Sequence, residues 1–152
     1  MQSKPYSRLQ KWLHLLVVVF LVVDVAFQGG MTTAFRRGVQ TGEFMLSPSA
    51  SMHFLIGIAV LLAVLARLTL VREQGGMQTR AALPFMAIYV LLILVALSGV
   101  LAWGLGSATV AKLHHLISLA LYGVVVVHVI GRFVVEFVLK NNTLSRMFSD
   151  FW

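Results

Sequence analysis

Residues 111–140 read AKLHHLISLALYGVVVVHVIGRFVVEFVLK, an apolar stretch that is long enough to cross a bilayer and is interrupted by histidines. An ionisable side chain inside such a helix is costly and usually serves a site in the bundle interior. His114 and His128 are 14 residues apart, nearly four helical turns, so both imidazoles leave the same helix face about 21 Å apart along the axis. One histidine is therefore expected near each side of the membrane.

The composition of the 152-residue chain is that of an integral membrane protein. Hydrophobic residues make up 59% of it, charged residues 11%, and the mean hydropathy is +0.91. The net charge of +7 is spread between the apolar blocks, where it indicates topology, so we do not expect nucleic-acid binding. Because the chain has no cysteine, thiolate iron–sulfur ligation and covalent haem attachment through a CxxCH motif are excluded.

Four apolar blocks predict an all-α, integral membrane four-helix bundle that forms a single domain over residues 1–152. The helices are expected at about residues 9–28, 52–71, 83–103 and 113–139. Residues 29–49 are polar and glycine-rich, and we expect a connection there with room for a short interfacial helix. Residues 104–111 predict a tight link, so the third and fourth helices should be antiparallel neighbours.

Lysine and arginine in the short flanks predict the orientation, because cytoplasmic flanks carry the excess of these residues. One side of the membrane receives Lys4, Arg8, Lys11, Arg67, Arg72, Arg80, Arg132, Lys140 and Arg146. The other side receives only Arg36, Arg37 and Lys112. Both termini are therefore expected in the cytoplasm.

In that orientation the histidines pair by depth. His14 and His128 lie near the cytoplasmic side, whereas His53 and His114 lie near the outer side. Each pair brings imidazoles from two helices to one level, which is how helix bundles build cofactor sites. A planar macrocycle ligated axially from both sides accounts for both pairs, so we expect two b-type haems, an inner one on His14 and His128 and an outer one on His53 and His114.

Other uses of these histidines compete with haem. A structural zinc site needs four close ligands, and no single level offers them. A haem-free proton or metal transporter is the remaining alternative. His115 is a rival ligand to His114, but its 13-residue spacing to His128 is about 140° out of phase on a helix. We expect His115 to be an interfacial residue or a hydrogen-bond donor beside the haem.

Several charged residues fit the same arrangement. Arg67 follows His53 by 14 residues and so shares its face at the level of the inner haem, and Arg132 lies one turn beyond His128. Arginine forks hold carboxylates, so both are candidates for the inner haem propionates, with Lys112 or Arg36 for the outer ones. The alternative is that these cations are anchors that extend to the headgroups.

Two further residues in the apolar blocks have more than one interpretation. Asp24 is deep for an acid, and we expect a carboxylate that reaches the interface rather than a proton carrier or the partner of a basic residue. Gly57 follows His53 by one turn and would leave room for a ring, although ordinary helix packing explains it equally well.

The chain resembles the bacterial di-haem cytochrome b561 family, four-helix membrane proteins whose haems are ligated from helices one, two and four. The resemblance rests on YSRLQKWLH at residues 6–14, MHFLIG at residues 52–57 followed by Arg67, and the His114 to His128 pair leading into LKNNTLSRM at residues 139–147. It implies a multi-pass protein of the bacterial inner membrane. Such a protein moves electrons between a partner at the outer surface and a quinone, which is ubiquinone or another type.

Within the family, YSRLQ…H and KNNTL.RM are most similar to the free-standing superoxide oxidases, which pass electrons from superoxide to quinone. This implies a superoxide:quinone oxidoreductase, in which Arg36 and Arg37 would attract the anion. The alternative is a haem-bearing cytochrome b subunit that anchors a periplasmic dehydrogenase or hydrogenase and acts through that redox partner. The sequence identifies no catalytic residue.

Overall fold

The computed structural model describes residues 7–73 and 83–138 as four long helices. They are α1 (Arg8–Thr41), α2 (Pro48–Glu73), α3 (Leu83–Leu105) and α4 (Ala108–Phe133), and α4 continues into a π-helical segment, η2 (Val134–Val138). All four are long and apolar enough to cross a membrane, and no strand occurs in these residues. The predicted all-α membrane bundle is confirmed, whereas the cytoplasmic placement of the termini stays a prediction.

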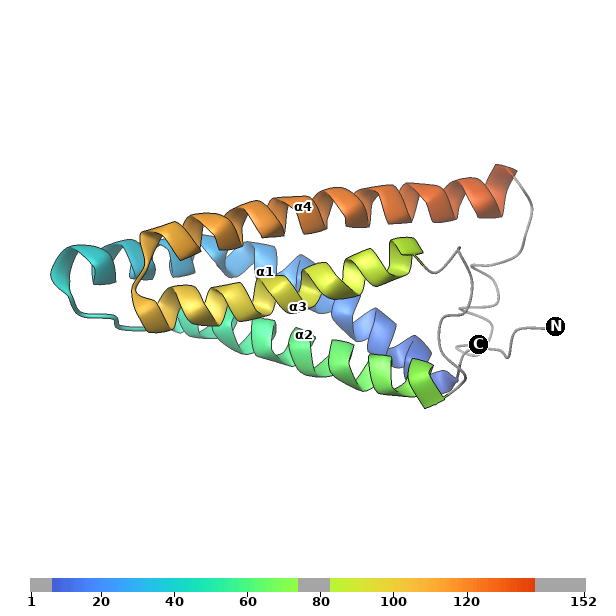
Figure 1. Ribbon diagram of the computed structural model, residues 1–152, viewed down its shortest axis with the longest axis horizontal. Helices are drawn as coiled ribbons and strands as arrows, with labels where there is room; N and C mark the ends of the chain where they lie inside the picture. Colours follow the sequence, from blue (N-terminus) through green and yellow to red (C-terminus); the bar gives the residue numbers. More distant parts are fainter. Residues whose placement is uncertain (1–6, 74–82, 139–152) are drawn as a thin grey trace.

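The helices alternate in direction along one bundle (Figure 1). We call the end that holds the α1–α2 and α3–α4 links the linker end, and the opposite end, where α1 begins and α4 stops, the terminal end. Some residues used in the sequence analysis lie outside the described residues: Lys4, Tyr6, Arg80, Lys140, Arg146 and the rest of the 139–147 motif.

Helix α1 is longer than predicted, because it does not end near residue 28 but continues to Thr41. Gly30 lies inside the helix as a packing position, since a Cβ there would collide with the side chain of Ser49 at the start of α2. The helix stops at Gly42, whose φ of 77° is left-handed and therefore favours glycine. At 34 residues α1 measures about 51 Å, more than the roughly 30 Å of hydrocarbon.

The link between α3 and α4 is shorter than the predicted segment 104–111, since only Gly106 and Ser107 separate the two helices. Gly106 has a left-handed φ of 57°, which turns the chain. Ser107 then caps α4 by accepting a hydrogen bond from the Val110 N–H at 3.4 Å. The two helices therefore form a tight antiparallel hairpin, as expected.

The helices do not all pack equally closely. Helix α1 packs along α2, α3 packs along α4, and α2 also contacts α3. Within residues 7–73 and 83–138, α4 makes at most isolated backbone contacts with α1 and with α2. The apolar core between the helices contains Val17, Ile56, Val60, Ala63, Val64, Leu92 and Leu121. The pairs α1–α3, α1–α4 and α2–α4 therefore have their backbones farther apart than the three closely packed pairs do.

An aromatic cluster closes the linker end. The rings of Phe35, Phe44 and Trp103 lie with centroids 5.8, 6.4 and 5.4 Å apart, two of the three pairs edge to face. Gly38 and Gly106 make room for it, because a Cβ at either position would meet the ring of Phe44. The cluster joins α1, the α1–α2 link and α3.

Candidate functional site

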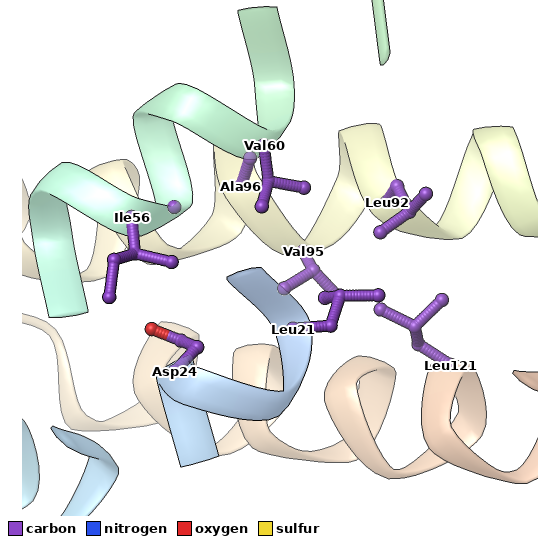
Figure 2. A pocket seen from close by; sticks show the side chains of 9 residues that line it. Leu21, Asp24, Ile56, Val60, Leu92, Val95, Ala96 and Leu121 are labelled. Carbon is purple, nitrogen blue, oxygen red and sulfur yellow. The ribbon is translucent and has the colours of Figure 1, made fainter. Parts of the chain in front are cut away.

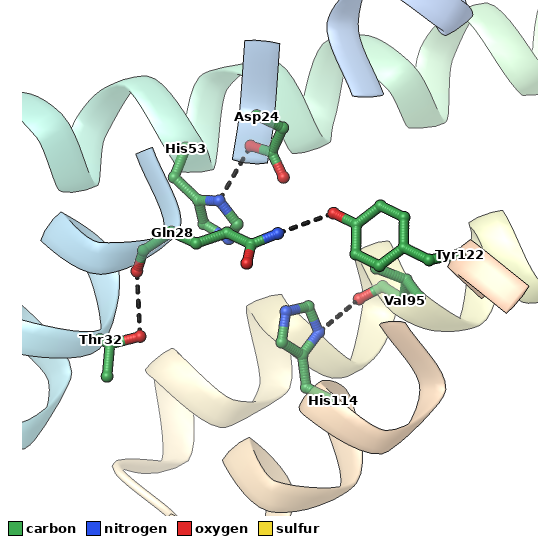
Figure 3. Close-up of polar contacts among 7 residues, drawn as sticks. All are labelled: Asp24, Gln28, Thr32, His53, Val95, His114 and Tyr122. Carbon is green, nitrogen blue, oxygen red and sulfur yellow. Dashed lines mark hydrogen bonds and ion pairs between the residues drawn. The ribbon is translucent and has the colours of Figure 1, made fainter. Parts of the chain in front are cut away.

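Two histidines face each other inside the linker end of the bundle. The imidazoles of His53 on α2 and His114 on α4, which we call the linker-end pair, have centroids 6.4 Å apart and planes at 86°. His114 Nδ1 donates a hydrogen bond to the backbone carbonyl of Val95 at 3.0 Å (Figure 3). Because a carbonyl only accepts, this contact places the proton of neutral His114 on Nδ1 and leaves Nε2 with a free lone pair for a metal.

Helix α3 has no histidine but positions His114. The Ser98 hydroxyl lies 3.2 Å from His114 Nδ1 and donates to the Val95 carbonyl at 3.0 Å. At the next residue, Gly99, an added Cβ would lie 3.0 Å from His114 Cε1, so the ring rests directly against the α3 backbone. Ser98 and Gly99 therefore belong to the histidine site.

Asp24 on α1 lies beside His53, with its Oδ1 2.8 Å from His53 Nδ1 (Figure 3). The two side chains are 14% and 17% exposed, and the contact has the distance but not the alignment of a hydrogen bond. The interpretation of Asp24 as a carboxylate that reaches the interface is therefore wrong. The position of Asp24 along α1 agrees with the sequence, but its side chain turns inward to His53 on α2.

A third polar contact joins α1 to α4 at the same level. Gln28 Nε2 donates to Tyr122 Oη at 2.7 Å. Together with the contacts of Asp24 and His114, it links all four helices around the linker-end pair (Figure 3). Neither Gln28 nor Tyr122 was predicted as a site residue. The available signal was that Asp24 and Gln28 are spaced i, i+4 and so share one helix face.

The terminal half of the bundle brings together a second group of predicted residues. His14 on α1 lies within electrostatic range of His128, Arg67 and Arg132, and His128 interacts with the same two arginines. We call His14 and His128 the terminal-end pair. Arg67 Nε is buried and has no hydrogen-bond partner within the described residues. A buried guanidinium N–H of this kind requires an acceptor, such as a carboxylate.

Comparison with known proteins identifies the family. A sequence model described as prokaryotic cytochrome b561 matches residues 5–150. The chain belongs to this cytochrome b561 family. A cytochrome b562 from Cereibacter sphaeroides is 31% identical over an alignment of 157 positions that covers 96% of each chain. No solved structure matches the chain.

Family membership confirms the resemblance found in the sequence. The protein is a membrane b-type cytochrome of electron transfer, and it spans a bacterial membrane several times. The donor set fits haem, because haem iron needs only two axial nitrogens. No group of three or more histidines and carboxylates that could hold a metal ion occurs in residues 7–73 and 83–138.

Open space lies beside His53. A Cβ added at Gly57, one turn after His53, would meet no atom within 4 Å. Gly57 lines a cavity whose other lining residues are apolar except for Asp24. Figure 2 shows Asp24 and Ile56 among the side chains around this cavity.

The remaining predicted site residues lie on the outside of the cytochrome. Arg36 and Arg37 are exposed on the extension of α1 at the linker end, and Lys112 is exposed in the first turns of α4. The described structure shows none of the three in contact with the linker-end pair. His115 is exposed as well.

Proposed function

We propose that this cytochrome holds two b-type haems and transfers electrons across the bacterial inner membrane, between a donor at its outer surface and the quinone pool. When bound, haem supplies one-electron redox chemistry. The observation that carries the proposal is the presence of two histidine pairs at the two ends of one bundle, each contributed by two helices. His53 and His114 would hold one haem, and His14 and His128 the other.

The charged residues have distinct roles in this proposal. Arg67 and Arg132 would bind the propionates at the terminal end, supported by the buried Arg67 Nε that requires an acceptor. Lys112 or Arg36 would bind the haem propionates at the linker end. The linker end is the outer side, because the flanks of the terminal end carry most of the lysines and arginines.

The haem assignment is tested by replacing each histidine with alanine and measuring the haem-to-protein ratio and the visible spectrum. Replacing His53 or His114 should remove one haem and leave the other, and replacing His14 or His128 should remove the second. If either change emptied both sites equally, or neither, the pairing would be wrong. His115→Ala is the matched control and should retain both haems.

Superoxide is our specific proposal for the donor at the linker end. Two superoxide anions each lose one electron and leave as dioxygen, while one quinone takes up two electrons and two protons. Exposed Arg36 and Arg37 would raise the association rate of a small anion. Two acids lie on the same half of the bundle. Glu43 is exposed near the two arginines, whereas the Asp24 carboxylate is turned inward toward His53.

Rapid mixing of the oxidised cytochrome with superoxide tests this donor. We expect fast haem reduction that slows with ionic strength and with the double substitution Arg36→Gln plus Arg37→Gln. The matched control is Arg8→Gln plus Arg72→Gln, which removes the same charge at the terminal end and should leave the rate unchanged. Reduction no faster than that of free haemin would exclude superoxide.

A second candidate function is that of a haem-bearing anchor subunit for a periplasmic dehydrogenase or hydrogenase. Large apolar side chains are exposed in and beside the α1–α2 link, where Val39 is 47%, Leu46 43% and Met45 73% exposed. An apolar surface beyond the bilayer is typical of a protein interface. Rapid haem reduction by a co-purifying dehydrogenase, with slow reduction by superoxide, would establish this function instead.

A further inference from the structure

The two histidine pairs have neighbours of opposite charge. At the linker end the nearest charged group is the carboxylate of Asp24, 2.8 Å from His53 Nδ1, and its charge also acts on His114 and Tyr122. At the terminal end the guanidinium groups of Arg67 and Arg132 act on both His14 and His128. The bundle therefore has an electrostatic gradient along its axis inside the membrane.

The two members of the linker-end pair also differ from each other. His114 Nδ1 donates to a neutral backbone carbonyl, whereas His53 Nδ1 faces a carboxylate. The negative charge of a carboxylate beside a ligating imidazole raises the basicity of that imidazole more than a neutral carbonyl does, and a more basic ligand stabilises the oxidised, more positive iron. The negative charge acts in the same direction through space, and the low exposure of both side chains limits its screening by solvent.

We propose that Asp24 is a positioning residue that acts through His53 to keep the reduction potential of the linker-end site below that of the terminal-end site. An electron shared between the two sites would then reside mainly at the terminal end. The gradient favours transfer from the outer surface toward the opposite side, so the direction of electron flow is built into the bundle. This inference rests on the proposed function, since it requires haem at both pairs.

Asp24→Asn tests the inference directly, because asparagine has nearly the same shape and removes only the charge. A potentiometric titration of the haem absorbance should show the lower midpoint rising while the upper one stays in place. We expect the equilibrium for sharing an electron between the sites to shift by about tenfold, equivalent to about 59 mV for a one-electron couple. Glu43→Gln, which removes the same charge at an exposed position, should shift neither midpoint.

Two further measurements keep the test decisive if Asp24→Asn folds poorly. Asp24→Glu keeps the charge and should retain the low midpoint. In His53→Ala, the haem that disappears should be the one with the lower midpoint. Loss of the higher-midpoint haem from His53→Ala, or equal movement of both midpoints in Asp24→Asn, would overturn the inference. A wild-type protein with only one haem would instead refute the proposed function itself.

Discussion

Gly99→Ala tests whether the close approach of α3 determines the position of His114. An added Cβ would lie 3.0 Å from His114 Cε1 and 3.3 Å from Nδ1, inside the usual carbon contact distance of about 3.5–4.0 Å. The imidazole must then move by a few tenths of an ångström, which weakens its 3.0 Å hydrogen bond to Val95. Overpacking costs about 1–3 kcal/mol, whereas alanine in place of a mid-helix glycine gains about 1 kcal/mol.

The net penalty of up to about 2 kcal/mol corresponds to a loss of up to about 30-fold in the population of the native arrangement. We expect reduced haem occupancy at the linker-end site and unchanged occupancy at the terminal-end site, measured by the haem-to-protein ratio and the reduced-minus-oxidised spectrum. Gly104→Ala is the control, because it lies on the same helix and its Cβ would meet no atom within 4 Å. If the two variants retained haem equally, the role given to Gly99 would be refuted.

Three other substitutions test separate contacts. Gly30→Ala should lower the unfolding temperature by several degrees, because its Cβ collides with Ser49, whereas Gly29→Ala meets no atom within 4 Å and should not; equal values would exclude this packing contact. Arg67→Ala should lower the midpoint of the terminal-end haem, since loss of a nearby positive charge favours oxidised iron, and an unchanged titration would leave Arg67 as a topology anchor. Tyr122→Phe removes the 2.7 Å hydrogen bond between α1 and α4 and should cost about 0.5–1.5 kcal/mol, seen as a lower unfolding temperature; no decrease would mean that this contact adds no stability.

The membrane helices could be predicted from the sequence because a lipid-facing helix must be apolar over about 20 residues. The length of α1 could not be predicted in this way. Beyond the hydrocarbon a helix needs no apolar face toward lipid, so residues 29–41 have the composition of a polar link although they continue the helix. The packing of Gly30 against Ser49 is a tertiary contact, and the glycine therefore looked like a helix end.

The depth of each histidine could also be estimated from the sequence, because helical rise and period fix position along the axis. The sideways contacts could not, since they depend on the rotation and tilt of each helix within the bundle. Asp24 illustrates the difference: its depth was clear, but whether it turned toward lipid headgroups or toward His53 was decided by the packing of α1 on α2. The Ser98 and Tyr122 contacts depend on packing in the same way.

The two-residue link between α3 and α4 has a consequence for biogenesis. His114 and its acceptor Val95 are 19 positions apart on a hairpin, so this ligand can be oriented as soon as the hairpin enters the membrane. His14 and His128 lie on the first and last helices, so their site can form only after nearly all of the chain has been translated. The ligands of the linker-end site are therefore all translated before those of the terminal-end site, and haem arriving during synthesis would meet the linker-end site first.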